Sequence, residues 1–202
     1  MGRAIAFVFL GIIIAGFALL ASRGNEDTWI CQNGMWVKHG NPSDPKPLIP
    51  CRTKADRMNI FSPAFTDNGK LPAKYSCQGE GMSPPFSFVG VPTAAKSLAL
   101  FLDDPDAPFG IFHHWLVWNI DPKATEIQEN GVLEGVAIGT NSAGASAYEP
   151  ACPPSGTHRY IFTLMALDTK LTLTDTATRP EFDAASKGHV IATATLTTRY
   201  AK

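Results

Sequence analysis

The sequence contains little charge and no surplus of either sign. Charged residues make up 17% of its 202 residues, and 17 Lys and Arg stand against 18 Asp and Glu, so the formal net charge is −1. A nucleic-acid-binding protein needs a basic surplus to contact phosphates, so this balance argues against that class. Disordered chains are rich in charge and poor in apolar residues, whereas 45% of this chain is hydrophobic. Most of it is therefore expected to fold.

Several short motifs of metal and catalytic sites are also missing. The four cysteines include no C-x-x-C pair, which argues against a zinc ribbon or a thioredoxin-type redox site, and none lies in a lipobox. Neither H-x-H nor H-E-x-x-H occurs, and there is no G-x-S-x-G nucleophile elbow. We therefore expect no metal and no cofactor.

Charge is almost absent from the N-terminal end. Only Arg3 is charged in the first 22 residues, and residues 4–21 form an unbroken run of eighteen apolar residues. As a helix this run would be about 27 Å long, close to the thickness of the hydrocarbon core of a bilayer. It predicts either an uncleaved transmembrane anchor in residues 1–22 or a cleaved secretory signal. Small residues are poorly placed for cleavage, which favours a single-pass membrane protein over a secreted one. Both alternatives place the rest of the chain outside the cytoplasm.

All four cysteines follow the apolar run, as expected for a chain exported to an oxidising compartment. Four cysteines allow three pairings. Pairing Cys31 with Cys51 and Cys77 with Cys152 keeps each disulfide within one unit of the chain, and this is the pairing we expect.

Residues 23–57 are predicted to form a small spacer. Two short apolar runs flank Asn33-Gly34, a dipeptide that favours a tight hairpin turn. Prolines at positions 42, 45, 47 and 50 then predict an extended, semi-rigid segment, closed onto the hairpin by Cys31–Cys51. Residues 1–57 carry a formal charge of +3 and residues 58–202 a charge of −4. The sequence thus divides into a basic tether and a mildly acidic main domain.

Residues 58–202 predict a mainly β domain, most simply a β-sandwich. Its apolar runs have the length of strands and are rich in β-branched and aromatic residues; they cover residues 86–91, 98–102, 115–120, 160–167 and 190–198. Trp115 and Trp118 lie three apart on one predicted strand and should therefore pack on opposite faces. One helix is well marked, with a capping-box pattern from Thr178 to Glu181 and Gly188 at its end.

Two polar motifs lie at the ends of predicted strands. Residues 103–108 read DDPDAP and are followed by FHHW at 112–115, and residues 156–160 read GTHRY. A carboxylate beside an imidazole can fix its tautomer, and imidazole and phenol groups can donate hydrogen bonds to a phosphate-like anion. Strand ends are also where a β-scaffold commonly presents binding groups. The motifs therefore predict a polar pocket.

These motifs, together with HHWLVWNI, ACPPSGTHRY and GHVIATATLTTRY, resemble the phosphatidylethanolamine-binding protein (PEBP) family in its bacterial Raf-kinase-inhibitor-like branch. The resemblance covers about residues 58–202. It implies an antiparallel β-sandwich with short peripheral helices and a small surface pocket for phospholipid head groups or other anions. The ligand-binding residues that it implies are Asp104, His114, His158 and Tyr160. The supporting residues are Asp106, Pro108 and Arg159.

One segment departs from the family pattern. Bacterial relatives usually carry a Gly-rich Y-G-G-P-C-P-P sequence where this chain has Glu149 and Pro150. Glycines let backbone N–H groups approach an anion. The two replacements remove one donor and add a negative charge, so we expect them to affect anion affinity.

Three functions follow as hypotheses. The first is a membrane-tethered extracytoplasmic domain that binds an anionic small molecule. The second is a hydrolase, metal-dependent or not, that uses the Asp/His cluster. The third is modulation of an unidentified protein partner through the rim of the domain. Two details stay open: Asp106 and Arg159 either pair with each other or contact the ligand, and His113 is expected to be a neighbour of the pocket rather than part of it.

Overall fold

The computed structural model describes residues 27–32, 35–49, 51, 57–131 and 134–202. The chain divides into two compact units between positions 51 and 52. The apolar run of residues 4–21 and the turn at residues 33–34 lie outside the described residues. Within the described part, no helix is both long enough and apolar enough to cross a membrane. The membrane anchor therefore stays a prediction.

The smaller unit is a β-hairpin joined to a proline-rich segment. Its strands β1 (Thr28–Gln32) and β2 (Met35–His39) pair antiparallel. The indole N–H of Trp29 donates to the Asp44 carbonyl at 2.9 Å, and that of Trp36 donates to the Ile49 carbonyl at 2.8 Å. The predicted Cys31–Cys51 disulfide is confirmed, with 5.4 Å between its Cα atoms. Two indoles and one disulfide thus fasten the proline-rich segment to the hairpin.

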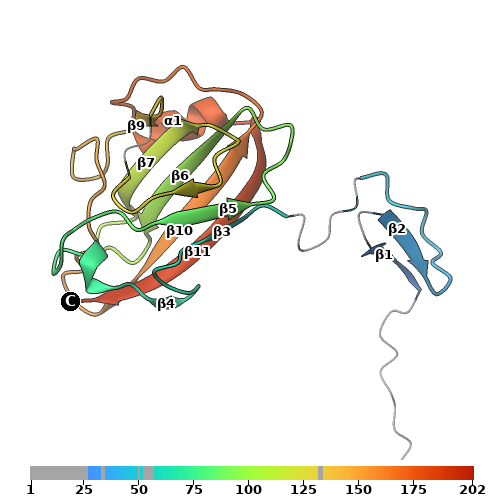
Figure 1. The fold of residues 1–202 in the computed structure, drawn as a ribbon, viewed down its shortest axis with the longest axis horizontal. Coiled ribbons are helices and arrows are strands. Elements are labelled where there is room, and N and C mark those ends of the chain that lie inside the picture. The colour runs from blue at the N-terminus through green and yellow to red at the C-terminus, as the bar shows by residue number, and fades with distance from the viewer. Residues whose placement is uncertain (1–26, 33–34, 50, 52–56, 132–133) are drawn as a thin grey trace, which may run out of the picture. The chain divides into compact units, whose positions relative to one another are not determined.

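The main unit contains two β-sheets, and Figure 1 labels all of their strands except β8. The larger sheet has the strand order β4 (Gly69–Lys70), β11 (Val190–Ala201), β10 (Thr157–Leu167), β6 (Ser97–Asp104), β7 (Phe112–Ile120) and β9 (Ala137–Ile138). The smaller sheet has the order β3 (Asn59–Phe61), β5 (Phe86–Val89) and β8 (Glu126–Ile127). All pairings are antiparallel except β4 with β11.

The period-two alternation of side chains gives the larger sheet a core on each face. On one face, Trp115 belongs to the hydrophobic core shared with the smaller sheet, which includes Ile60 and Phe86. On the other face, Trp118 packs in a second core that includes Phe182. The prediction that the two tryptophans face opposite sides is confirmed, because residues three apart on a strand point in opposite directions.

A single α-helix, α1 (Arg179–Ser186), covers that second face. The Glu181 carboxylate accepts a hydrogen bond from the Thr178 backbone N–H at 2.7 Å, as the capping-box pattern predicts. Phe182 is fully buried and meets the Phe101 ring edge-on at 4.6 Å. The mainly β fold is confirmed. Instead of several short helices, the described residues contain this helix and one 3-10 turn, η2 (Ala73–Tyr75).

The central strands are longer than predicted, and their extra residues position the polar motifs. β6 continues to Asp104, and β10 begins at Thr157, because the backbone there still pairs with neighbouring strands. Asp103 lies opposite both Ile161 of β10 and His113 of β7. The end of β6 and the beginnings of β7 and β10 therefore meet at one end of the sheet.

Candidate functional site

The four predicted pocket residues come together where these strand ends meet. All of them line one pocket of about 210 Å³ and all are buried. They are Asp104 at the end of β6, His114 near the start of β7, and His158 and Tyr160 near the start of β10. Such a volume suits a small ligand, since pockets for drug-sized molecules start at about 300 Å³.

Asp104 orients its neighbours with both carboxylate oxygens. One oxygen lies 2.7 Å from Nδ1 of His158, and the other accepts a hydrogen bond from the Asp106 backbone N–H at 2.8 Å. Asp104 is 3% exposed and His158 is 7% exposed. An ionised carboxylate only accepts hydrogen bonds, so Nδ1 of His158 carries a proton and Nε2 is left for a ligand. Asp104 thus fixes the ring and the following loop.

His114 has a defined tautomer. Its Nδ1 lies 2.8 Å from the Glu149 carbonyl oxygen, which can only accept, so Nδ1 carries a proton. Burial lowers the pKa of His114 below its ordinary value of 6.5, which favours the neutral ring near pH 7. Nε2 then presents a lone pair, and it has no hydrogen-bond partner in the described part of the chain.

Tyr160 contributes a hydroxyl without a partner. The residue is fully buried, and its O–H finds no acceptor among the described residues, although the Cys152 backbone lies close enough to the oxygen to act as a weak donor that lowers its pKa. Burial, and after it the negative charge of Asp104, raises the pKa of Tyr160 well above its ordinary value. The phenol is therefore neutral at physiological pH and keeps an unused donor. Its ring meets that of His114 edge-on at 5.3 Å.

Apart from Glu149, the rest of the pocket wall is formed by apolar residues. The Phe112 ring lies 4.6 Å from the His114 ring, and Phe112 and Pro154 line the pocket although the sequence motifs did not single them out. The one available signal was that Phe112 directly precedes the two histidines. The other lining residues are Ala107, Pro108, Glu149, Pro150 and Cys152.

The departure from the family pattern lies in this wall. Glu149 and Pro150 line the pocket, and the Glu149 N–H donates to the His114 carbonyl at 2.9 Å. That N–H is thus already used, and Pro150 has none. This wall therefore offers a ligand no free backbone donor from these two residues.

The predicted supporting residues divide into two groups. Pro108 lines the pocket, whereas Asp106 and Arg159 do not. The Arg159 guanidinium donates to both Asp106 oxygens, from Nη2 at 2.6 Å and from Nε at 2.9 Å, and its backbone N–H donates at 2.9 Å. These hydrogen bonds lower the pKa of Asp106. Of the two alternatives, the internal pair is the one present.

His113 lies outside the pocket. Its Nδ1 is 2.8 Å from Asp103, whose second oxygen accepts from Arg179 of α1 at 2.7 Å. His113 thus joins β7 to the helix, in agreement with its expected role as a neighbour.

The metal-dependent form of the hydrolase hypothesis finds no ligand set here. The described residues contain no group of three or more His, Cys, Asp or Glu side chains arranged to hold a metal ion. Both oxygens of Asp104 are engaged, and Asp106 is held by Arg159. The cluster is therefore built as a hydrogen-bonded pocket.

The second predicted disulfide supports the pocket wall. Cys152 is linked to Cys77, with 5.4 Å between their Cα atoms, which confirms the pairing. Beside it, the Cys77 N–H donates to the Ala151 carbonyl at 3.1 Å. Both cysteine side chains are exposed, and Cys152 lines the pocket.

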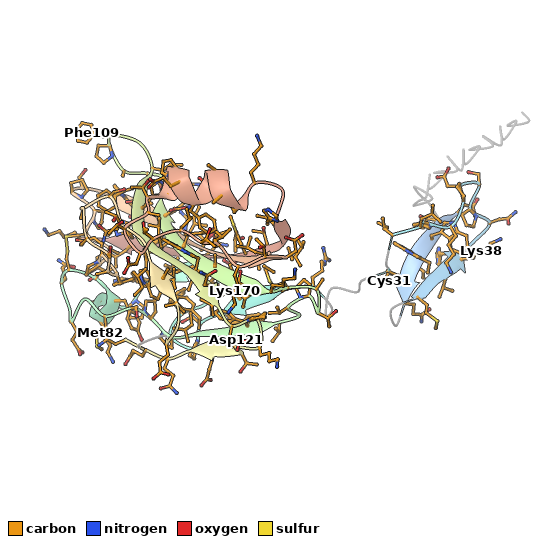
Figure 2. All side chains as sticks on the ribbon, turned by 90° about the horizontal axis from the view of Figure 1, so that it is seen from above. Cys31, Lys38, Met82, Phe109, Asp121 and Lys170 are labelled. Atoms are coloured by element: carbon orange, nitrogen blue, oxygen red, sulfur yellow. A yellow bond between two sulfur atoms is a disulfide. The ribbon has the colours of Figure 1, made fainter. Side chains whose placement is uncertain are left out.

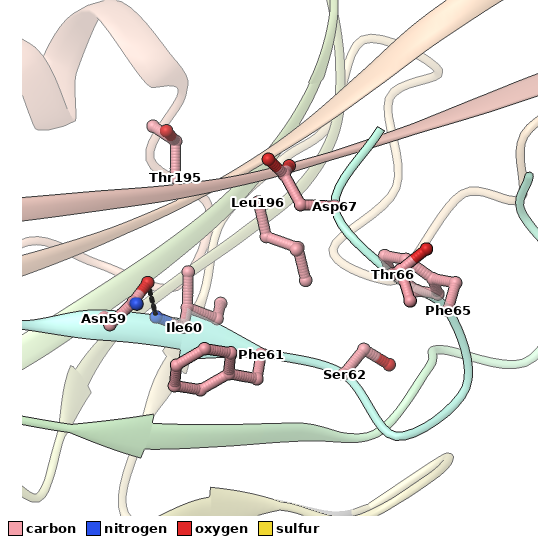
Figure 3. A pocket seen from close by; sticks show the side chains of 9 residues that line it. All are labelled: Asn59, Ile60, Phe61, Ser62, Phe65, Thr66, Asp67, Thr195 and Leu196. Atoms are coloured by element: carbon pink, nitrogen blue, oxygen red, sulfur yellow. Dashed lines mark hydrogen bonds between the residues drawn. The ribbon is translucent and has the colours of Figure 1, made fainter. Parts of the chain in front are cut away.

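A larger hollow of about 320 Å³ lies between β3 and β11 (Figure 3). Phe61 of β3, Leu196 of β11 and Asp67 line it, and the Asp67 oxygens already accept from the Thr197 N–H and the Asn68 side chain. No histidine or basic side chain lines this hollow. We therefore take the smaller pocket, which contains the buried polar groups, as the candidate site.

A β-sandwich that carries a small pocket of imidazole, carboxylate and phenol groups at one sheet end has the features of a ligand-binding domain. The family model described as phosphatidylethanolamine-binding protein matches residues 61–201. The chain belongs to this family, as its motifs indicated.

Relatives and solved structures agree with this assignment. A UPF0098 protein of Methanothermobacter thermautotrophicus is 47% identical over 69% of this chain and 95% of its own length. A PEBP homologue from Chlamydia trachomatis has a similar structure, with a TM-score of 0.71 and 41% identity over 73% of this chain and 99% of that one. Escherichia coli YbcL, described as a member of the mammalian PEBP family, has a TM-score of 0.69 and 28% identity, covering 72% and 99%. These matches cover the main unit.

Proposed function

We propose that the main domain binds a small phosphate-bearing ligand, such as a phospholipid head group, in the pocket formed by Asp104, His114, His158 and Tyr160. The observation that carries this proposal is the set of unused polar atoms in a buried site. The Tyr160 hydroxyl has no partner, and Nε2 of each histidine has none in the described part of the chain. A buried hydroxyl normally has a partner, and a ligand in the pocket would supply one for Tyr160.

The pattern of donors and acceptors favours a ligand that combines anionic phosphate oxygens with a proton to donate. Neutral His114 offers a lone pair at Nε2 and would accept a hydrogen bond from the P–OH group of a monoester or from the ammonium group of an ethanolamine head group. The Tyr160 hydroxyl would donate to an unprotonated oxygen. Phosphate and phosphate monoesters retain a proton in part near neutral pH, because the second pKa of a monoester is about 6.

We further propose that residues 4–21 hold this domain at the outer surface of the cell membrane. The support is the unbroken apolar run and the two disulfides, which suit an oxidising compartment. A binding role is favoured over hydrolysis, because none of the described residues that line the pocket is a Ser, Thr or free Cys that could act as a nucleophile.

The test is a titration of the full chain with phosphoethanolamine, followed by NMR of the imidazole nitrogens. We expect the signals of His114 and His158 to shift together. Sulfate is the matched control: it resembles phosphate in shape but carries no proton for His114, so it should bind more weakly at pH 7. If neither imidazole responds at millimolar phosphoethanolamine, the proposed function is wrong.

The variant Glu149→Gln provides a second test, for which we expect tighter anion binding. Removing one negative charge from the wall should strengthen anion binding by about 1 kcal/mol, roughly five-fold, because like charges a few ångströms apart repel. An unchanged affinity would show that the Glu149 carboxylate does not face the ligand.

A further inference from the structure

The loop between β6 and β7, residues 105–111, carries two exposed apolar side chains; we call it the rim loop. Phe109 is 103% exposed and Ile111 is 59% exposed, the highest values among large apolar side chains in the described part of the main unit. Figure 2 shows Phe109 at the tip of a loop that projects from the domain. Neighbouring exposed apolar residues on a soluble surface commonly mark an interaction site.

The loop is fixed at both ends, so its apolar tip is held away from the domain. At one end, Asp106 is bound by Arg159 through three hydrogen bonds. At the other end, the His113 N–H donates to the Ser142 hydroxyl at 2.9 Å. Between them, Gly110 adopts a φ of 108°, in the region that favours glycine, and allows the tight turn at the tip.

The tip lies next to the candidate pocket. Pro108 and Phe112 line the pocket and also line a shallow hollow beside Phe109 and Ile111. An apolar surface therefore runs from the pocket mouth to the end of the loop. In a bilayer, the layer of phosphate groups lies directly above the apolar chains, so polar and apolar groups are adjacent there as they are on this surface.

We propose that the rim loop inserts Phe109 and Ile111 into the interface of a zwitterionic bilayer, which places the pocket mouth at the level of the lipid phosphates. The proposal deepens the proposed function and rests on it. A lipid surface is the occupant we select because the predicted anchor, residues 4–21, keeps the domain beside a bilayer. Aromatic and aliphatic side chains are also the groups that enter this interface.

Charge decides which lipids are expected. The base of the loop is neutral, because Asp106 and Arg159 compensate each other. Residues 58–202 carry a net charge of −4 and provide no general attraction to anionic lipids. Insertion should therefore depend little on salt and should not require anionic lipid.

The insertion can be measured on the full chain in phosphatidylcholine vesicles. All four native cysteines are in disulfides, so an introduced cysteine provides the sole free thiol. A nitroxide at Phe109→Cys should be accessible to oxygen and protected from a water-soluble nickel complex. The matched control is Phe61→Cys, because Phe61 is an exposed phenylalanine of β3, 47% exposed; its label should be accessible to nickel. Equal access of nickel to both labels would overturn the proposal. Protection of the label at position 109 in the absence of lipid would also overturn it, because it would indicate a contact with protein.

A second pair of variants tests whether Phe109 drives the insertion. The label at Ile111→Cys should lose lipid contact when Phe109→Ser is added, whereas Phe61→Ser should leave it unchanged. Soluble phosphoethanolamine should still shift the His114 and His158 signals in Phe109→Ser. Loss of insertion with intact head-group binding would show that Phe109 acts in insertion alone. Insertion without head-group binding would contradict the proposed function and not the insertion itself. Lipid contact that is unaffected by Phe109→Ser would overturn the inference.

Discussion

The buried Tyr160 hydroxyl has no acceptor among the described residues. Removing it should therefore raise the stability of the main unit and weaken ligand binding. A buried unpaired polar group costs about 1–3 kcal/mol, so Tyr160→Phe should raise the free energy of unfolding by about 1 kcal/mol. The same change removes the donor offered to the ligand and should weaken phosphoethanolamine binding about tenfold. Urea unfolding and the NMR titration measure the two effects.

Tyr148 is the control for this prediction. Its hydroxyl donates to the Tyr75 carbonyl at 2.9 Å, so Tyr148→Phe should lower stability by about 1 kcal/mol. If both Phe variants lose stability equally, the Tyr160 hydroxyl has a partner in solution, and its role in the pocket must be reconsidered.

His114 should make the stability of the main unit depend on pH. Its pKa in the folded chain lies below 6.5, so the unfolded chain binds more protons just below that pH. The contribution of His114 is therefore complete above about pH 6.5 and is lost as the pH falls below it, with a slope of at most about 1.4 kcal/mol per pH unit. Urea unfolding between pH 7.5 and 5 would measure this slope.

His114→Asn isolates the contribution, because an amide can still donate to the Glu149 carbonyl but does not titrate. The variant should show a shallower decline than the parent chain over the same pH range. Parallel curves for the two proteins would mean that the loss at low pH arises elsewhere.

At the scale of secondary structure, helix α1 depends on one buried side chain. Phe182 is fully buried between Phe101 and Trp118 on the outer face of the larger sheet. Phe182→Ala should destabilise the main unit by about 3–5 kcal/mol through the cavity that it leaves. Phe182→Leu should cost less than about 1.5 kcal/mol if the site repacks. Thermal unfolding distinguishes the two changes.

The milder variant also tests whether helix and pocket are independent. Phe182 does not line the pocket, so Phe182→Leu should bind phosphoethanolamine as the parent chain does. Weakened binding in a well-folded Phe182→Leu protein would show that the helix supports the pocket through Arg179 and Asp103.

The sequence predicted the strand cores and the helix start well because each depends on local chemistry. A run of strand length that is rich in β-branched residues marked β11, and the Thr178–Glu181 pair marked the start of α1. The end of β6 was missed because Asp103 and Asp104 have a low preference for strands, and pairing with neighbouring strands holds them extended. The start of β10 was missed because its first residues are polar and do not extend the apolar run.

The polar part of the site could be read from motifs, whereas its geometry could not. The DDPDAP and GTHRY motifs contain the titratable groups, but only the register of β6, β7 and β10 brings these groups together. Phe112 and Pro154 were missed because an apolar wall residue resembles any core residue until its neighbours are known. The tautomer of His114 likewise depends on a carbonyl 35 residues away in the sequence.

At the scale of the whole chain, each of the two disulfides belongs to a different unit. The Cys31–Cys51 bond closes a loop with a sequence separation of 20 residues in the hairpin unit, and Cys77–Cys152 closes one of 75 residues in the main unit. The chain-entropy model assigns them about 3 and 4.5 kcal/mol respectively. Because each bond joins two cysteines of the same unit, it should stabilise that unit only.

Calorimetry of two double variants tests this independence. Cys77→Ser/Cys152→Ser should lower the melting temperature of the main unit markedly, since losing about 4 kcal/mol is a large fraction of the stability of such a domain. It should also weaken phosphoethanolamine binding, because Cys152 forms part of the pocket wall. Cys31→Ser/Cys51→Ser should abolish the ordered hairpin but leave the main transition and the binding unchanged. An equal fall in the main transition for both variants would contradict the assignment, because it would require the hairpin to stabilise the sandwich directly.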